Sequence, residues 1–248
     1  MNPGLIPAAF VRCISEDGRN EMLHIVGVAS QDKLKLLHMG VKIPEQPSPL
    51  PNILRTNFVI VCPANFVPKK GHSFLIDACG LLVKRCIINL QCLLTSDGPL
   101  DAEIRSQIQQ LGLEKVICLL GRIQYRRLLD MYAEGEVDVV VLPSIVLADG
   151  EREGIPVALM EAMAYGIPVI STKTGGIPEL LKSGAGLLVP PGSSEELADA
   201  IAQIINKEDL RLNLAKKGRE RISEEFDLRK NAALLFSMLD KHKRDKKA

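Results

Sequence analysis

Two glutamates eight positions apart, Glu153 and Glu161, stand in the segment EREGIPVALMEAMAYGIPVIST (151–172). Glu161 falls in the middle of a predicted helix, 156–165, that is apolar almost all the way round and is therefore expected to be buried. A carboxylate taken out of water is unfavourable unless a specific group meets it. A helix rises about 1.5 Å per residue, so eight residues span on the order of 12 Å, comparable to two sugars joined by a pyrophosphate. We therefore expect each glutamate to accept hydrogen bonds from the hydroxyls of one sugar.

The start of the same helix is suited to a phosphate. Pro156 fits the first helical position, where a missing N–H has no consequence. A helix N-terminus offers unpaired N–H groups and partial positive charge, which together attract an anion. Lys70, in the turn PKKG, would add a full positive charge, although an ordinary turn lysine is the alternative interpretation. Sugar, diphosphate and sugar in this order are the layout of a nucleotide-sugar.

The elements that must position these groups follow a regular order. From residue 58 onward, short β-branched runs alternate with helical patterns. Strands that are apolar on both faces, each followed by a helix, predict an α/β fold: a doubly wound, Rossmann-like parallel sheet covered on both sides. The predicted strands are 58–62, 88–94, 116–120, 137–142, 168–171 and 186–189. The predicted helices are 72–85, 99–111, 125–133, 156–165, 178–182, one that begins after Ser193, 209–225 and 228–242.

Glycine and polar residues gather where the predicted strands end. In an open parallel sheet, ligands bind outside the carboxyl ends of the strands, at the point where the strand order reverses. Five such ends in a row favour one shared site along that rim. Polar, glycine-rich loops are common, however, so any single loop has an ordinary interpretation. The groups in question are Asn65 and Lys70, Asp97 and Gly98, Gly121 and Arg122, Ser144 to Glu153, and Thr172 to Gly176.

The first part of the chain has a different organisation. A strand, a helix and another strand are expected within AAFVRCIS, EDGRNEMLHIVG and KLKLLHMGV, and a proline-rich stretch, KIPEQPSPLPN, reads as a stiff linker. The piece before that linker is too small to hold a core alone. It reads as the end of a domain whose beginning is absent. The expected organisation is a truncated amino-terminal domain (1–43), the linker (44–56), a nucleotide-sugar-binding domain (57–227), and a crossover helix with a basic tail (228–248).

Composition narrows the class of protein. The chain has 248 residues, 46% hydrophobic and 25% charged, as expected of a globular protein with a core. A net charge of +1 gives no electrostatic case for nucleic acid as a partner. The six cysteines form no C-x-x-C pair, and no secretory signal or apolar run of about 18 residues is present. A cytoplasmic location is expected. The basic tail Lys241–Lys247 reads as a solvated helix end, with peripheral contact at the inner face of the membrane as the alternative.

Four segments together resemble a known family: EGIPVALMEAMAYGIPVISTKTGGIPELL, NFVPKKGHSFLIDA, SDGPL and GAGLLVPPGSSEELADAI. They are similar to the carboxyl-terminal, donor-binding domain of retaining glycosyltransferases of family four, which have the GT-B fold. The resemblance covers about residues 57–240, and the Glu-x7-Glu pattern in this setting is specific. The form DGEREGIP is most similar to members that build exopolysaccharides.

The resemblance implies a role for each matching position. Glu153 would contact the donor sugar and Glu161 the ribose hydroxyls. Lys70 and the helix start would stabilise the departing diphosphate, so Glu153 and Lys70 are the expected catalytic residues. The other expected substrate-binding residues are Gly154, Ile155, Pro156 and Val157 at the diphosphate, Gly121 and Arg122 near the base, and Asn65, Gly175 and Gly176 along the rim. A salt bridge would explain Arg122 as well, and a tight turn would explain Gly175 and Gly176.

Two positions depart from the family's pattern. The family usually has arginine where this chain has Asn65, so one phosphate contact is either lost or supplied by Lys69. It also usually has glycine at the position of Ser96. The sequence has no Asp-x-Asp pair to hold a metal between carboxylates and phosphates. Neither a metal nor another cofactor is expected.

The leading hypothesis is a retaining hexosyltransferase that moves sugar from a nucleotide-diphosphate donor to a saccharide or lipid-linked acceptor in polysaccharide biosynthesis. In this family the acceptor site lies in the amino-terminal domain, so this chain alone is expected to be inactive without a separate copy of that domain. A nucleotide-sugar-binding module that transfers nothing is the second hypothesis. A nucleotide-sugar epimerase of the same fold is a third, against which the Glu-x7-Glu pattern argues.

Overall fold

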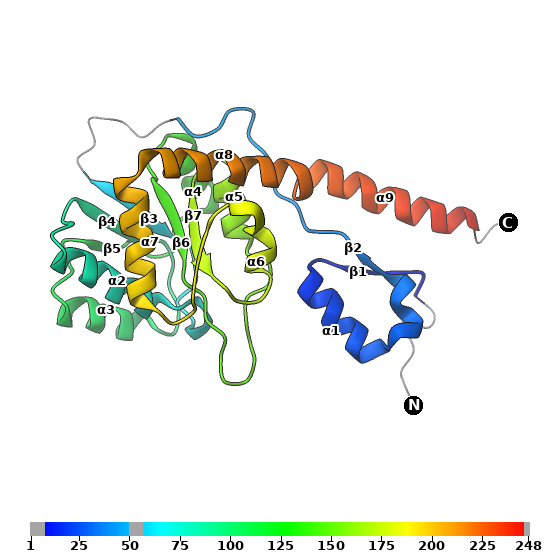
Figure 1. The fold of residues 1–248 in the computed structure, drawn as a ribbon, viewed down its shortest axis with the longest axis horizontal. Helices are drawn as coiled ribbons and strands as arrows, with labels where there is room; N and C mark the ends of the chain where they lie inside the picture. Colours follow the sequence, from blue (N-terminus) through cyan, green and yellow to red (C-terminus); the bar gives the residue numbers. More distant parts are fainter. Residues whose placement is uncertain (1–7, 50–56, 246–248) are drawn as a thin grey trace.

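The computed structural model describes residues 8–49 and 57–245 and has a six-stranded parallel sheet at its centre (Figure 1). The strand order is β5-β4-β3-β6-β7-β8, and every neighbouring pair is parallel. This sheet confirms the predicted α/β, doubly wound class. The strands are β3 (Phe58–Cys62), β4 (Leu90–Leu94), β5 (Ile117–Leu119), β6 (Val139–Leu142), β7 (Val169–Thr172) and β8 (Leu187–Val189).

Helices cover both faces of the sheet. Right-handed crossovers place α2 (His72–Lys84) and α3 (Asp101–Gln110) on one face. They place α4 (Tyr125–Ala133), α5 (Val157–Ala164) and α6 (Ile177–Leu180) on the other. Beyond the sheet, α7 (Ser194–Asn206) packs on α2, and α8 (Glu208–Glu225) packs on α5. Ser193 caps α7 as predicted, because its hydroxyl accepts a hydrogen bond from the Glu196 N–H at 3.3 Å.

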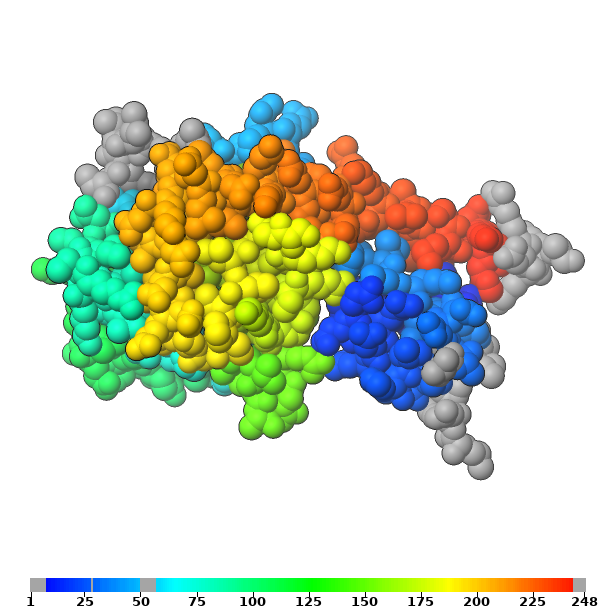
Figure 2. Space-filling model, in the orientation of Figure 1, coloured from blue at the N-terminus to red at the C-terminus, as the bar shows by residue number. Residues whose placement is uncertain are grey.

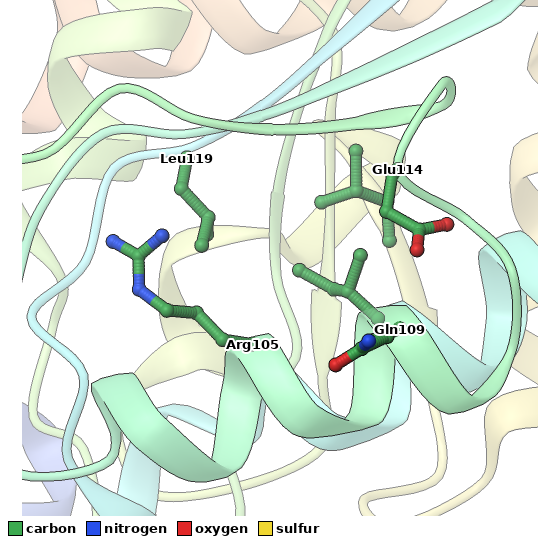
Figure 3. Close-up of a pocket in the computed structure, with 6 residues that line it drawn as sticks. Arg105, Gln109, Glu114 and Leu119 are labelled. Carbon is green, nitrogen blue, oxygen red and sulfur yellow. The ribbon is translucent and has the colours of Figure 1, made fainter.

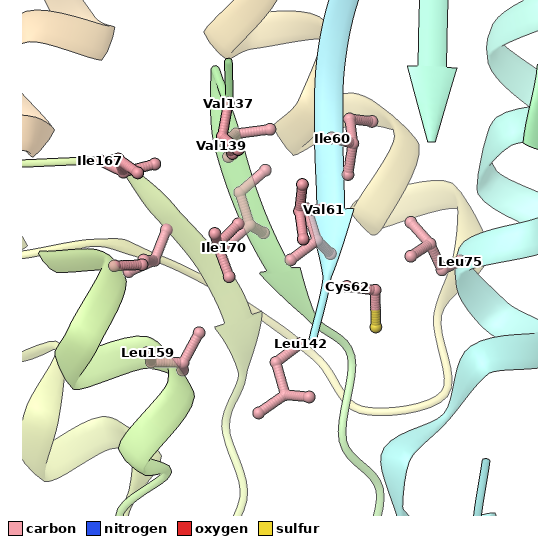
Figure 4. Packing of buried hydrophobic residues seen from close by; sticks show 14 of the residues in the cluster. Ile60, Val61, Cys62, Leu75, Val137, Val139, Leu142, Leu159, Ile167 and Ile170 are labelled. Atoms are coloured by element: carbon pink, nitrogen blue, oxygen red, sulfur yellow. The ribbon is translucent and has the colours of Figure 1, made fainter. Parts of the chain in front are cut away.

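The core lies between the central strands and these helices (Figure 4). Ile60 and Val61 of β3, Val139 of β6 and Ile170 of β7 are fully buried. Burial of one such side chain contributes about 1.5–3 kcal/mol relative to leaving it exposed. Because these strands are covered on both faces, their sequences are continuously apolar rather than alternating. The interior therefore fixes the sheet, while its carboxyl edge is left to polar loops.

A small unit precedes the main sheet. It contains β1 (Val11–Cys13), α1 (Glu16–Val26), a 3-10 turn (Val28–Lys33) and β2 (Leu34–Leu36), with β1 and β2 parallel. Both strands are shorter than the predicted segments. The chain then passes Val41, whose N–H and C=O bond to the backbone of Phe226 and Leu228.

The last helix joins this unit to the main domain. α9 (Leu228–Asp245) extends past the sheet beside β1 and β2 (Figure 1), and Asn231 donates hydrogen bonds to the carbonyls of His38 and Met39. Across the described ranges 8–49 and 57–245, no helix is long and apolar enough to cross a membrane. The expected domain boundaries remain predictions. Residues 241–245 of the predicted basic tail belong to α9, whereas its residues 246–247 and the linker residues 50–56 lie outside the described residues.

Candidate functional site

The strand order reverses between β3 and β6, and the loops that follow these two strands hold the central pair of the site. Lys70 ends a 3-10 turn (Pro68–Lys70) after β3, and Glu153 lies in the loop after β6. The Lys70 Nζ lies 2.5 Å from Glu153 Oε2, and the two side chains are only 18% and 14% exposed. The topological switch point thus holds an ion pair between a lysine and a glutamate.

Close packing of the two loops explains how Lys70 reaches Glu153. Gly71 has a φ of +67°, and a Cβ at this position would lie 2.0 Å from the Pro143 carbonyl oxygen. Only glycine permits this approach. The Ile145 N–H also donates a 2.9 Å hydrogen bond to the Lys69 carbonyl. The segment between Lys69 and Gly71 is therefore held directly against the start of the Glu153 loop.

A second pair of glycines braces the same loop from β7. A Cβ on Gly175, whose φ is +52°, would lie 1.7 Å from the Glu153 carbonyl oxygen. A Cβ on Gly176 would lie 2.7 Å from Ile155 Cγ1 and 3.0 Å from the Gly154 carbonyl carbon. The backbone that these glycines approach is thus the loop carrying Glu153. Direct contact of Gly175 or Gly176 with a ligand remains a prediction.

The N-terminus of α5 opens beside this pair. Pro156 is the residue before the helix rather than its first turn, with φ −73° and ψ 120°. The Leu159 and Met160 amides both donate to the Pro156 carbonyl, so the amides of Val157 and Ala158 precede the first intrahelical bonds. A Cβ on Gly154 would meet nothing within 4 Å. Among the described residues, the amides of Val157 and Ala158 have no backbone partner, and the space beside Gly154 is open, which together suit an anion.

Glu161 meets a tyrosine. The Tyr125 hydroxyl, at the start of α4, donates a 2.6 Å hydrogen bond to Glu161 Oε1. Burial raises the pKa of Glu161, and the hydrogen bond from Tyr125 lowers it in part. Because residues 151–156 form a loop, only the stretch from Val157 to Glu161 is helical, so the helical rise applies to just half of the interval between the two glutamates.

The remaining rim residues form two further pairs. Ser96 donates a 2.8 Å hydrogen bond to Asn65 Oδ1, so the two positions that depart from the family's pattern contact each other. Arg122 Nη2 lies 2.9 Å from Asp97 Oδ1 in an exposed ion pair, which agrees with the alternative interpretation of Arg122. Gly121 has a φ of +67° with open space around it. None of these three substrate-binding assignments is tested by these contacts.

Three buried polar groups lie at the carboxyl edge without complete partners. Within the described residues, the hydroxyls of Ser144 and Thr174 and the Nδ1 atom of His72 have no hydrogen-bond partner. His72 Nε2 donates to the Ala64 carbonyl at 3.2 Å, and burial lowers the pKa of His72 to about 4. The imidazole is therefore neutral at pH 7 and serves as a structural group at the start of α2. An unpaired buried hydroxyl is unfavourable, so the rim has spare hydrogen-bonding capacity at Ser144 and Thr174.

Two cavities differ in their relation to this rim. A cavity of about 370 Å³ between α3 and β5, shown in Figure 3, is lined by residues such as Arg105, Glu114 and Leu119 and by none of the rim residues. A cavity of about 590 Å³ instead includes Tyr125, Val157 and Glu161. The second cavity belongs to the candidate site. Among the described residues, no group of three or more metal-ligating side chains is present.

Two residues of the site carry no motif that would have drawn attention to them. Tyr125 opens a predicted helix four positions after Gly121, and only that closeness to the rim points to it. Arg152 stands in the charged run DGERE; its guanidinium donates to Asp17 at 3.0 and 3.1 Å and also contacts Glu21, both on α1. Figure 2 shows the projecting loop around residue 150 next to the small unit. Such long-range partners cannot be deduced from local patterns.

A doubly wound sheet with a cation, two carboxylates and a free helix N-terminus at its switch point defines the class of a nucleotide-binding α/β domain. Comparison with known proteins makes the assignment specific. Residues 50–221 match the family described as Glycosyl transferases group 1, and the chain belongs to that family. It is thus a member of glycosyltransferase family four.

Named relatives agree with this assignment. The chain is 34% identical over 213 residues to the putative colanic acid biosynthesis glycosyltransferase WcaL of Salmonella typhimurium, a match that covers 84% of this chain and 48% of WcaL. It is 32% identical over 202 residues to the amylovoran biosynthesis glycosyltransferase AmsK of Erwinia amylovora, which covers 79% of this chain and 48% of AmsK. The chain therefore spans about half the length of the relatives it matches.

Solved structures give the same fold. Anabaena HepE in complex with UDP superposes with a TM-score of 0.79 at 26% identity, covering 94% of this chain and 64% of HepE. HepE has also been solved in complex with UDP-glucose. The carboxyl-terminal domain of the group 1 protein LpcC from Francisella tularensis superposes with a TM-score of 0.61 at 25% identity, covering 72% of this chain and 96% of that domain. The main sheet is thus the carboxyl-terminal domain of a GT-B fold.

Proposed function

We propose that this chain binds the nucleotide-diphosphate sugar donor of a retaining hexosyltransferase that acts in polysaccharide biosynthesis. The diphosphate lies at the N-terminus of α5 and beside Lys70, the donor sugar contacts Glu153, and the ribose hydroxyls contact Glu161. The observation that carries this proposal is the ion pair at the switch point between Lys70 and Glu153, which lies in the loop that leads directly into α5. The UDP and UDP-glucose complexes of HepE support a nucleotide-sugar as the ligand.

The chemistry follows from these groups. As the bond between the sugar and the diphosphate breaks, negative charge grows on the leaving phosphate. The Lys70 ammonium and the amides of α5 stabilise that charge, and they need no reorganisation because the loops already hold them. Glu153 orients the sugar by accepting hydrogen bonds from its hydroxyls. The acceptor is a saccharide or a lipid-linked saccharide.

A nucleotide-sugar-binding module is the second candidate. It is supported by the share of WcaL and AmsK that the chain matches, which is about half of each. In this case the chain holds the donor and transfers it only together with a separate domain. The two candidates share the donor site and differ only in turnover.

Calorimetric titration of the chain with UDP-glucose, GDP-mannose and ADP-glucose tests the shared site. One donor is expected to bind, and Glu153→Gln and Glu161→Gln are each expected to weaken it about tenfold or more, because each removes a charged hydrogen-bond acceptor. Glu220→Gln is the matched control, an exposed glutamate on α8 far from the rim in sequence. Failure of the folded chain to bind any of the three donors, or equal binding by all variants, would contradict the proposal.

Turnover separates the two candidates. The chain is incubated with the donor that binds and with an oligosaccharide acceptor, and free nucleoside diphosphate is measured. Release that depends on the acceptor supports a complete transferase. Tight donor binding with no acceptor-dependent release supports the binding module.

A further inference from the structure

The cavity beside Glu161 has the size and lining of a small-molecule site. Its volume of about 590 Å³ lies within the range of typical ligand pockets. One wall is formed by Tyr125 and Leu129 of α4, a second by Val157 and Glu161 of α5, and a third by the segment 40–45 that precedes the main domain. The lining is mostly apolar, with Glu161 on α5 and with Lys42 and Glu45 on the wall formed by residues 40–45. Such a lining suits a nucleoside, whose base is flat and apolar on its faces and whose ribose carries a diol.

The Glu161 carboxylate depends on Tyr125 for its geometry. Tyr125 is its only hydrogen-bond partner within the described residues, at 2.6 Å to Oε1, and no ion pair reaches it there. The hydrogen bond leaves Oε2 available. A half-buried carboxylate without a cation relies on such a donor to stay ionised and fixed in orientation.

Tyr125 is not placed as a core residue would be. Its side chain is 62% exposed, whereas Tyr132, about two helical turns further along α4, is fully buried. The exposed ring gains little from packing, so the hydroxyl bonded to Glu161 is the main contact that orients it. Tyr125 is the first residue of α4 and lines the cavity together with Glu161.

We propose that Tyr125 is the positioning residue of the nucleoside site: its hydroxyl holds Glu161 so that Oε2 accepts a hydrogen bond from the ribose of a ribonucleoside diphosphate. This inference rests on the donor site proposed above. It adds Tyr125 to that site and predicts that the site prefers ribose to 2′-deoxyribose. A carboxylate held in this way favours ribose over 2′-deoxyribose, because a site that hydrogen-bonds a hydroxyl discriminates against the analogue that lacks it.

The surroundings of Glu161 set how this contact depends on pH. Tyr132 of α4 and Tyr165 at the end of α5 carry the other nearby hydroxyls, and Lys42 and Glu45 are the charged groups on the wall formed by residues 40–45. Burial raises the pKa of Glu161, and the bond from Tyr125 opposes that effect. Tyr125→Phe removes the opposing effect, so the carboxylate protonates at a higher pH and the loss of ribose binding is larger at pH 6 than at pH 8.

The test is a calorimetric titration of the whole chain with UDP, GDP and ADP, and then with the 2′-deoxy form of whichever diphosphate binds. Wild type and Tyr125→Phe are compared at pH 6 and pH 8. Tyr132→Phe is the matched control, since it makes the same change on the same helix and its hydroxyl has no hydrogen-bond partner in the described part of the chain. Circular dichroism establishes that each variant is folded.

We expect Tyr125→Phe to bind the ribonucleotide about fivefold more weakly at pH 8, and more weakly still at pH 6, as for loss of one hydrogen bond. Its affinity for the 2′-deoxy form should stay close to that of wild type, so that the preference for ribose falls. Equal affinities of Tyr125→Phe and wild type, or an equal loss for both nucleotides at both pH values, would overturn the role of Tyr125 while leaving the donor site intact. Failure of wild type to bind any diphosphate would overturn the donor site itself and this role with it.

Discussion

The ammonium of Lys70 lies 2.5 Å from the carboxylate of Glu153, although 83 positions separate the two residues in the sequence. The pair is mostly buried, so each charge compensates the other in a region that water reaches poorly. Glu153 therefore keeps Lys70 in position before the ligand binds. In the proposed function, the diphosphate of the donor brings its own negative charge to Lys70. Glu153 and the diphosphate then share the Lys70 ammonium.

Removing one partner of the Lys70–Glu153 ion pair should lower the unfolding free energy more than removing both. Lys70→Met leaves Glu153 without its cation, and we expect a loss of unfolding free energy on the order of 2 kcal/mol, between the values for exposed and fully buried pairs. Lys70→Met/Glu153→Gln should recover part of that loss because no uncompensated charge remains. Urea unfolding of wild type, both single variants and the double variant gives the coupling. Strictly additive losses would show that the two side chains do not interact.

The sequence located the two glutamates but not what they meet. Glu161 stands out because it interrupts an apolar helix, and Glu153 stands out because it precedes Glu161 by eight positions. Their partners Lys70 and Tyr125 come from other strand–helix units, and only the order of the strands brings them together. The continuous apolar strands and the cap at Ser193 are local patterns, so the sheet and the helices were predictable.

Some of the site depends on contacts that no local pattern reports. Asn65 and Ser96 are separate departures in the sequence, yet they form one hydrogen-bonded pair in the structure. Gly175 reads equally well as a turn glycine or as a ligand-contacting one. Only the structure shows that Gly175 packs against the backbone of Glu153, where a side chain would not fit.

Gly175→Ala should displace the loop that carries Glu153. The new methyl group would lie 1.7 Å from the Glu153 carbonyl oxygen, in addition to the strain of a positive φ. Gly112→Ala is the matched control, because Gly112 also has a positive φ, +65°, but nothing within 4 Å of the new methyl group. We expect Gly112→Ala to reduce the unfolding free energy by about 1–2 kcal/mol from strain alone, and Gly175→Ala by about 2 kcal/mol more from the clash.

Binding of the nucleotide-sugar provides the second measurement for this pair of variants. Gly175→Ala should lose donor affinity because Glu153 and the loop before α5 are displaced, and Gly112→Ala should keep it. Equal stability of the two variants in urea, with equal donor affinity, would mean that the loop adapts to the methyl group and that Gly175 is a simple turn residue.

Neutral His72 should make the protein sensitive to acid. Burial lowers the pKa of His72 to about 4 in the folded state, below the value of about 6.5 for a free imidazole. The stability contributed by this residue is therefore complete above pH 6.5 and is lost as the pH falls toward 4. The loss over that interval is about 3 kcal/mol, because the unfolded chain takes up the proton first.

The prediction is checked by urea unfolding at pH 7, 6, 5 and 4. His72→Gln should be less stable than wild type at pH 7, and the difference should narrow as the pH falls. His24→Gln, at an exposed position on α1, serves as the control and should leave the acid dependence of wild type as it is. A constant difference between His72→Gln and wild type at all four pH values would show that His72 is not held in its neutral form.

Arg152 should hold the small amino-terminal unit against the loop that carries Glu153. Its guanidinium bonds to Asp17 and Glu21, which lie four positions apart on one face of α1. These side chains are partly exposed, so we expect the contact to contribute about 1 kcal/mol or less. Arg152→Ala should then raise the hydrogen-exchange rate of the α1 amides by about fivefold at most, and high salt should produce the same change in wild type. Arg126→Ala, which breaks an exposed pair within α4, should leave α1 unaffected. If the exchange of α1 is the same in Arg152→Ala and in wild type at low salt, the unit is held by its contacts with α9 and Glu179 instead.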